Sequence, residues 1–337
     1  RSVAAHSTPG SPPRLVFARV PQAPVAAAAP PWAWEAVRGS VEPFAVEVEA
    51  ALKSIKHQVI QVAPGGDPST ATPPQEDPFE CILMTREDTP DAAPVVMIPH
   101  GGPHSGLLTS WVMSHAFLCA LGYNVLQVNY RGSTGFGERP LQSLPGNIGR
   151  LDVADCLAAL DKAAEMGLVD SSRVAVVGGS HGGFLAAHLI GQAPDRFAAG
   201  VLRNPVCNIA AMVGMTDIPD WCFVEACGSG EGRARFTSTP SKEDYADLLA
   251  RSPVTYIDNI KAPALFLLGA KDLRVPYADG LQMVHGMRER GQVAEAIVFP
   301  EDSHPLVRRG PRDQPDVVGE VLKAAGPALD LLADLFF

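Results

Sequence analysis

Residues 177–183 constrain the fold more than any other segment, because they read Val-Gly-Gly-Ser-His-Gly-Gly between an apolar strand-like run and an apolar helical pattern. Gly178, Ser180 and Gly182 match the spacing G-x-S-x-G, which places a serine at the tip of a sharp strand-to-helix turn. Side chains two residues before and after that serine would collide, and glycine removes the collision. The segment therefore predicts an exposed nucleophile, Ser180, where a buried strand passes into a helix.

A glycine-rich turn of this kind also has a non-catalytic interpretation, because dinucleotide-binding sites use one. This chain lacks G-x-G-x-x-G spacing here, however, and no P-loop lysine follows. The flanking residues therefore favour the nucleophile. The first amides of the following helix would then direct partial positive charge at the reacting carbonyl.

From residue 94 onward, short apolar runs alternate with amphipathic helical patterns. The strand-like runs cover residues 95–98, 124–128, 173–177, 200–202, 264–268 and 296–299, and helices are expected at 110–121, 151–167, 181–192, 278–290 and 316–337. This alternation predicts an α/β fold: a doubly wound, mostly parallel sheet with helices on both faces. Reactive side chains are then expected on loops after the carboxyl ends of strands.

The first 94 residues differ, because they hold 15 of the 31 prolines. Two short strand-like runs, 58–62 and 79–84, lie among turn-forming residues. We expect residues 1–56 to form an irregular or partly disordered N-terminal extension, and residues 57–337 to form the catalytic domain. The chain starts with Arg1 rather than Met, which is consistent with a fragment of a longer protein.

Composition excludes several classes of function. With 27 basic and 37 acidic residues and a net charge of −10, the chain lacks the basic surface that nucleic acid or an anionic membrane requires. No apolar stretch reaches the roughly 18 residues of a membrane helix. Six cysteines without CxxC spacing indicate core residues in a reducing, cytoplasmic compartment: Cys81, Cys119, Cys156, Cys207, Cys222 and Cys227. No metal site and no cofactor is expected.

A serine hydroxyl needs a base, and in this architecture the chain order is nucleophile, carboxylate, histidine. Three histidines follow the turn: His188 on the helix that starts at the serine, His285 within another expected helix, and His304 in the polar loop after residues 296–299. The loop position makes His304 the best candidate for the base.

The carboxylate that orients the base is expected at the end of the preceding strand. Asp272 lies there, shortly after the run 264–268. Asp302 is the competitor, but it is two residues from His304 and would need an unusual loop to reach the ring. We therefore expect Asp302 to be solvated and Asp272 to complete a Ser180, Asp272 and His304 triad.

A second donor to the oxyanion is expected on a loop after an earlier strand. Residues 95–98 are followed by His-Gly-Gly-Pro-His at 100–104, in which two glycines let a backbone amide approach the substrate and Pro103 stiffens the turn. The backbone amides of Gly102 and His181 are the expected oxyanion hole. Alone, His-Gly-Gly-Pro could equally be an ordinary turn.

Together these residues resemble the prolyl oligopeptidase family. The resemblance runs from about residue 96 to 300 and rests on five segments: His-Gly-Gly-Pro-His at 100–104, Val-Asn-Tyr-Arg-Gly-Ser-Thr-Gly-Phe-Gly at 128–137, Gly-Gly-Ser-His-Gly-Gly at 178–183, Thr-Asp-Ile-Pro-Asp-Trp at 216–221 and Asp-Leu-Arg-Val-Pro at 272–276. It implies an α/β-hydrolase catalytic domain and no cofactor. It is strongest to the members that release an N-acylated residue from the blocked end of a short peptide.

In that family a β-propeller precedes the catalytic domain and restricts access to small peptides. This chain is too short to contain one, so residues 1–56 are expected to be a propeller's tail end or an unrelated extension, and the size filter would be missing. Pro305 also departs from the family pattern, which has a small residue after the histidine. We expect it to perturb the loop that carries the base.

The substrate-binding residues are less constrained. Trp221, Phe223 and Val224 would line an apolar pocket for the acylated residue, unless they serve in core or lid packing. The resemblance places Arg274 near the substrate, although an ion pair with a structural role fits its position equally well. Arg131 is expected to be structural, tying a strand end to its loop.

Two alternatives to a peptidase for N-acylated peptides remain at this stage. One is a broad serine carboxylesterase that uses the same triad on small esters. The other is a truncated hydrolase domain without activity, against which the intact serine, aspartate and histidine argue. Short N-acylated peptides are the expected partners, and homo-oligomers stay open.

Overall fold

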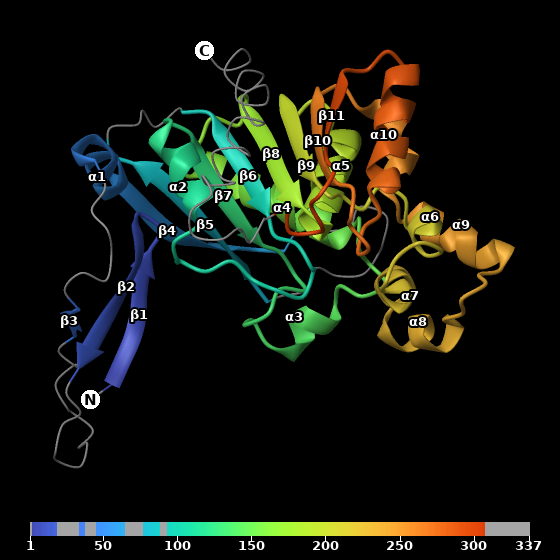
Figure 1. Cartoon of the computed structure of the whole chain (residues 1–337), viewed down its shortest axis with the longest axis horizontal. Helices are drawn as coiled ribbons and strands as arrows, with labels where there is room; N and C mark the ends of the chain where they lie inside the picture. The colour runs from blue at the N-terminus through green and yellow to red at the C-terminus, as the bar shows by residue number, and fades with distance from the viewer. Residues whose placement is uncertain (1, 19–33, 38–44, 65–76, 88–92, 307–337) are drawn as a thin grey trace.

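The computed structural model describes residues 2–18, 34–37, 45–64, 77–87 and 93–306. An eight-stranded sheet forms its centre (Figure 1). In spatial order the strands are β11 (Ala294–Phe299), β10 (Ala264–Gly269), β9 (Ala199–Arg203), β8 (Val174–Gly179), β6 (Val95–Pro99), β7 (Asn124–Asn129), β5 (Phe79–Arg86) and β4 (Ile55–Val62). The pairs from β11 to β7 are parallel, and β5 is antiparallel to both of its neighbours. The doubly wound, mostly parallel sheet is confirmed.

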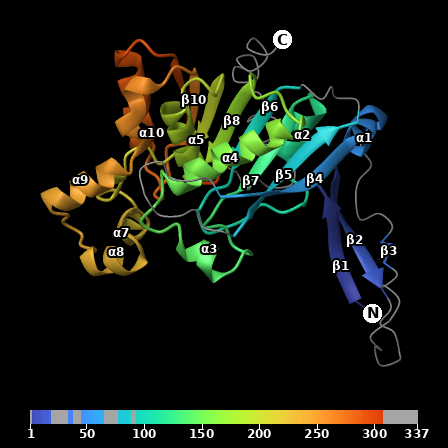
Figure 2. The ribbon, with the colours of Figure 1, turned by 180° about the vertical axis from the view of Figure 1, so that it is seen from behind.

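Helices cover both faces of this sheet. On one face lie α4 (Leu151–Glu165), α5 (His181–Gln192) and α10 (Tyr277–Glu289), and α2 (Met113–Ala120) lies on the other; α4 and α5 are in front of the sheet in Figure 2. Each face of the sheet has its own hydrophobic core, and successive side chains of β6 point to opposite faces. Val95 and Met97 pack into the core beneath α4, α5 and α10, and Val96 and Ile98 pack into the core beneath α2. Within the described residues we find no helix that could span a membrane.

A group of short helices gathers near the carboxyl ends of the strands (Figure 1). They are α3 (Glu138–Gln142), α6 (Ile209–Met212), α7 (Pro219–Cys227), α8 (Ser229–Arg235) and α9 (Lys242–Ala250). The 3₁₀ helix η1 (Pro253–Asn259) lies instead against the last turn of α5, where a Cβ on Gly191 would be 2.8 Å from Tyr256. Local signals set their ends: Pro219 begins α7, and Ser241 forms a capping box with Asp244 at the start of α9. They are too short for a periodic pattern to reveal them, so the sequence predicted none.

The expectation that residues 1–56 are irregular is wrong for the part that the structure describes. A separate antiparallel sheet contains β1 (Ser2–Thr8), β2 (Ser11–Ala18) and β3 (Glu35–Ala36), and α1 (Val46–Lys53) precedes β4. Thr8 pairs with Ser11, so Pro9 and Gly10 form a two-residue turn, and the ladder is irregular just before it. Proline therefore shapes this hairpin instead of preventing it. The helix expected at 316–337 lies outside the described residues.

Candidate active site

Ser180 occupies a strained turn between β8 and α5. Its backbone has φ 58° and ψ −122°, a conformation that a non-glycine residue rarely adopts. A Cβ atom on Gly178 would lie 2.0 Å from the carbonyl oxygen of Gly182, and one on Gly182 would lie 2.4 Å from that of Pro99. Both positions therefore require glycine, because a neighbouring backbone carbonyl lies too close to leave room for a side chain. The serine hydroxyl stands at the carboxyl end of a central strand, as the sequence predicts.

A cleft of about 820 Å³ opens at this serine. Its lining includes most of the residues singled out from the sequence: Gly102, Ser180, His181, Trp221, Arg274 and His304. These residues come from several loops at the carboxyl ends of the strands, so the fold brings distant parts of the chain to one place. In the described part of the chain, no cluster of three or more His, Cys, Asp or Glu side chains is arranged to hold a metal ion.

His304 and Asp272 form a hydrogen bond of 2.6 Å between Nδ1 and Oδ2. Asp272 Oδ1 accepts the backbone N–H groups of Arg274 and Val275, so the buried carboxylate is held from several directions. Because a carboxylate only accepts, Nδ1 of His304 carries the proton and Nε2 is left with a lone pair. That is the tautomer a general base requires. Pro305 does not prevent this pairing.

The competing residues are placed elsewhere. His188 is a buried residue of α5, where its Nε2 lies 3.1 Å from the carbonyl oxygen of Arg251 and burial lowers its pKa to about 4. His285 is exposed on α10 and lines a different groove. Asp302 corrects one expectation, because it is only 5% exposed instead of solvated. Its backbone carbonyl accepts the N–H of Lys271, which ties the loop of the base to that of the carboxylate.

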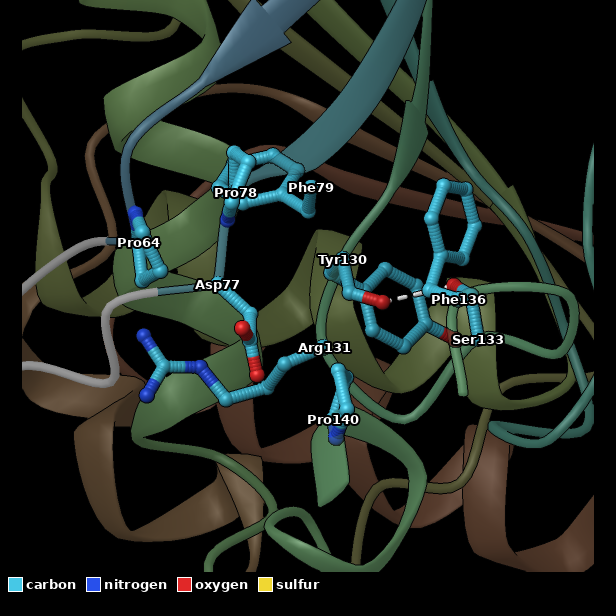
Figure 3. A pocket seen from close by; sticks show the side chains of 9 residues that line it. All are labelled: Pro64, Asp77, Pro78, Phe79, Tyr130, Arg131, Ser133, Phe136 and Pro140. Carbon is cyan, nitrogen blue, oxygen red and sulfur yellow. Dashed lines mark hydrogen bonds between the residues drawn. The ribbon is translucent and has the colours of Figure 1, made fainter. Parts of the chain in front are cut away.

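The loop after β6 approaches the nucleophile closely. A Cβ on Gly101 would lie 2.7 Å from the carbonyl oxygen of Gly179, and Gly102 has φ 57°. His100 anchors the loop: its ring stacks on Tyr130 with centroids 4.4 Å apart, and its Nε2 lies 2.7 Å from Ser133 Oγ. Figure 3 shows Tyr130 and Ser133 on the turn after β7, joined by the hydrogen bond from Ser133 Oγ to the Tyr130 carbonyl. Burial lowers the pKa of His100 to about 4, so it acts as a neutral anchor.

Two buried contacts to carboxylates hold the elements behind the site. His181 Nε2 lies 3.0 Å from Asp152 Oδ2, which fixes the first turn of α5 to the start of α4. Arg131 forms a buried ion pair of 2.6 Å with Asp155 of α4, and Asp155 also accepts the Arg131 backbone N–H. Arg131 is therefore structural, as expected, although it ties the strand end to a helix.

The residues proposed to bind substrate divide into two groups. Trp221 lines the cleft edge-on to His181, and Arg274 lines it while pairing with Asp217 through contacts of 2.7 and 3.2 Å. The prediction for Phe223 is wrong, because its side chain is fully buried in the core and packs against Phe236. Val224 does not line the cleft either. Successive residues of helix α7 face different directions, so of these three residues only Trp221 reaches the cleft.

Comparison with known proteins agrees with this geometry. Residues 110–323 match the model of the prolyl oligopeptidase family. The chain belongs to the prolyl oligopeptidase family. An acylamino-acid-releasing enzyme of Arabidopsis thaliana is 43% identical over 309 residues, which cover 91% of this chain and 40% of that protein. The rice acylamino-acid-releasing enzyme 1 is 47% identical over 275 residues, 82% of this chain and 35% of that protein. The chain thus spans well under half the length of these relatives.

Solved structures of acylaminoacyl peptidases share this fold. The acylaminoacyl peptidase of Pyrococcus horikoshii superimposes with a TM-score of 0.75 at 19% identity, over 99% of this chain and 48% of that one. An acylaminoacyl peptidase in complex with Z-Gly-Gly-Phe-chloromethyl ketone gives a TM-score of 0.73 at 20% identity, over 97% of this chain and 47% of that one. These likenesses establish the α/β-hydrolase fold.

Asn204 is a residue of this prolyl oligopeptidase domain that the sequence analysis missed. Its side-chain Nδ2 donates to the His304 carbonyl at 2.8 Å, and its Oδ1 accepts the Gly269 N–H at 2.8 Å. The preceding Arg203 carbonyl accepts the Ser180 N–H at 2.9 Å. The segments that carry nucleophile, carboxylate and base therefore meet at one position. Asn204 has φ 42°, and the Asn-Pro turn after an apolar run was the available signal.

Asn204→Asp should lower kcat by about 10- to 100-fold, with KM little changed, because displacing a catalytic group by about 1 Å has an effect of that size. The aspartate keeps the shape and the acceptor for Gly269 but loses the donor to the His304 carbonyl. Steady-state kinetics measures the effect, and thermal melting verifies the fold. Unchanged kcat in the folded variant would show that Asn204 does not position the base.

His104 and Glu225 form a second polar pair at the cleft. His104 Nδ1 donates to the Gly132 carbonyl at 2.9 Å, and its Nε2 lies 3.2 Å from Glu225 Oε1. Glu225 is 3% exposed and raises the pKa of His104. Since both ring nitrogens face acceptors, the imidazolium form is favoured. The pair clamps the end of the loop that carries Gly102 against α7.

Glu225→Gln should remove a pH-dependent part of the stability. A histidine whose folded pKa is raised adds stability that is complete below its unfolded pKa of about 6.5 and lost as pH rises through the folded value. The difference in urea midpoint between wild type and variant should therefore narrow as pH increases from about 6 to 9. Other titrating groups contribute equally to both proteins. A constant difference across that range would contradict the charged pair.

Proposed function

We propose that this chain is the catalytic domain of a serine peptidase that removes an N-acylated residue from the blocked end of a short peptide. The observation that carries the proposal is the convergence of Ser180 and the hydrogen-bonded His304–Asp272 pair on one cleft. The relatives named acylamino-acid-releasing enzymes support the substrate class.

Catalysis would proceed through an acyl-enzyme. Ser180 Oγ attacks the carbonyl of the acylated residue while His304 Nε2 takes its proton, and Asp272 stabilises the imidazolium that forms. The backbone amides of Gly102 and His181 donate to the oxyanion. His304 then gives the proton to the leaving amine. In the second half, water attacks the ester and the N-acyl amino acid is released.

The described residues also bear on the specificity. Trp221 offers an apolar wall beside the nucleophile for the side chain of the acylated residue, and Arg274 stands at the same cleft with its charge balanced by Asp217. A blocked N-terminus carries no charge, and among the described residues that line the cleft the carboxylate of Glu225 is paired with His104, which suits an uncharged N-terminus better than a free amine.

We further propose that residues 57–337 form the catalytic domain and that residues 1–56 are the end of a preceding β-propeller. The separate antiparallel sheet of β1, β2 and β3 supports this division, and the central sheet begins at β4, which starts at Ile55. A cytoplasmic location is proposed because all six cysteines are free thiols, five of them buried.

Three chromogenic substrates test the proposal. N-acetyl-alanyl nitroanilide should be hydrolysed much faster than alanyl nitroanilide, and a short nitrophenyl ester should also react because it shares the acyl-enzyme step. Turnover of the ester alone would replace the peptidase with a carboxylesterase. Turnover of none of them would support an inactive domain.

Asp272→Asn should lower kcat by about 10⁴ with KM little changed, because an amide donor favours the wrong tautomer of His304 and cannot stabilise the imidazolium. Asp302→Asn is the matched control, because Asp302 lies on the loop of the base while Asp272 is the carboxylate bonded to the His304 ring. Kinetics on an acetylated dipeptide amide, with thermal melting of both variants, makes the comparison. A large loss of kcat in Asp302→Asn, together with a wild-type kcat in Asp272→Asn, would refute the triad.

A further inference from the structure

Among the described residues, two arginines line the cleft, and they differ in how their charge is balanced. Arg274 makes a bidentate ion pair with Asp217. The guanidinium of Arg203, by contrast, donates at 2.7 Å to a backbone carbonyl, that of Pro305, and within the described ranges it makes no ion pair with a carboxylate. Asp272 acts on Arg203 electrostatically, but its oxygens already accept from His304, Arg274 and Val275.

The position of Arg203 is fixed by the sheet. It ends β9, directly opposite Gly179 in the parallel ladder with β8. A Cβ on Gly179 would lie 2.5 Å from one guanidinium nitrogen and 3.0 Å from its central carbon, so the guanidinium lies over the residue before the nucleophile. A side chain at position 179 would displace this guanidinium from its place. The charge therefore stands between the nucleophile turn and the residue after the base.

This position corresponds to the leaving-group side of the site. During cleavage His304 must deliver a proton to the departing amine, so the departing peptide lies next to His304. Arg203 is bonded to the adjacent Pro305 and is exposed in the cleft. The guanidinium contacts Gly179, the residue next to Ser180, so it stands near the scissile bond, and one or two residues of extended peptide reach only about 3.5–7 Å beyond that bond. Arginine stays charged at any physiological pH and presents a planar set of donors that suits a carboxylate.

We propose that Arg203 binds the C-terminal carboxylate of the departing peptide when one or two residues follow the scissile bond. This inference rests on the proposed peptidase function and adds a second determinant of substrate length. A free acid would gain a charge-assisted hydrogen bond in a partly enclosed cleft, whereas a longer peptide or a C-terminal amide would not. Selection for short peptides would then come in part from the catalytic domain itself.

The test compares N-acetyl-Ala-Ala as a free acid with its C-terminal amide, measuring released N-acetylalanine by chromatography. Wild type should favour the acid by ~10-fold or more in kcat/KM, the size expected of one hydrogen bond to a charged group. Arg203→Met should bring the acid-to-amide ratio close to one, and Arg203→Lys should retain part of the preference. Loss of the contact with Pro305 could slow the cleavage of both substrates equally. The acid-to-amide ratio of kcat/KM within one variant is not changed by such a general loss.

Arg274→Met is the matched control, because it removes the other cleft arginine, whose charge is already paired. Its acid-to-amide ratio should stay at the wild-type value. A wild-type ratio near one, or equal ratios in wild type and Arg203→Met, would overturn the carboxylate subsite while leaving the peptidase intact. If wild type cleaves neither dipeptide nor the acetylated nitroanilide, the proposed function itself fails.

Discussion

Ser180→Ala should lower kcat by about 10⁶, the loss that follows removal of the nucleophile in serine hydrolases. Without the hydroxyl no acyl-enzyme can form, and the remaining oxyanion donors give only residual catalysis. The strained backbone at φ 58° exposes this hydroxyl to the cleft. Substrate binding should be largely retained, because alanine removes one oxygen and leaves the lining unchanged.

Labelling with a fluorophosphonate followed by peptide mapping provides an independent measurement. The reagent should modify Ser180 in wild type and leave the Ser180→Ala variant unmodified. Ser172→Ala serves as the control, since Ser172 is an exposed turn residue bonded to Asp170 away from the cleft. A label on any other serine in wild type would contradict the assignment.

His304→Ala should lower kcat nearly as much as Ser180→Ala does, by about 10⁶, because nucleophile and base act as one unit. The alanine cannot take the proton of Ser180 or return it to the leaving amine. His285→Ala is the matched control: this histidine is exposed on α10 and lines a separate groove. Its kcat should stay within a few-fold of wild type.

Burst kinetics on the acetylated nitroanilide, with thermal melting of both histidine variants, would separate the loss of chemistry from the loss of fold. If His304→Ala and His285→Ala lost activity equally while both remained folded, His304 would not be the base. The hydrogen bond of 2.6 Å to Asp272 would then have a purely structural role.

The parts of this molecule that could be predicted from the sequence are those with a strong local pattern. Continuous apolar runs mark buried parallel strands, and the strained turn at Ser180 demands glycine on both sides. The placement of Asp272 and His304 followed from chain order in this architecture. Each of these depends on neighbours in the sequence or on the topology of the sheet.

Features that depend on distant contacts could not be predicted in the same way. Proline content suggested an irregular start, whereas Pro9 and Gly10 make the turn of a hairpin whose strands are specified by their pairing. Phe223 and Trp221 have similar apolar character, and only the packing of α7 decides that Trp221 reaches the cleft. Asp302 reads as a polar loop residue, yet the fold buries it.

The order of the catalytic residues along the chain has a consequence during synthesis. Ser180 leaves the ribosome well before Asp272 and His304, and domains are made from the N-terminus at about 5–20 residues per second. For several seconds the nascent chain therefore contains a nucleophile without a base. Under the proposed mechanism the nascent chain cannot form an acyl-enzyme efficiently until the loops of Asp272 and His304 have emerged and packed beside Ser180.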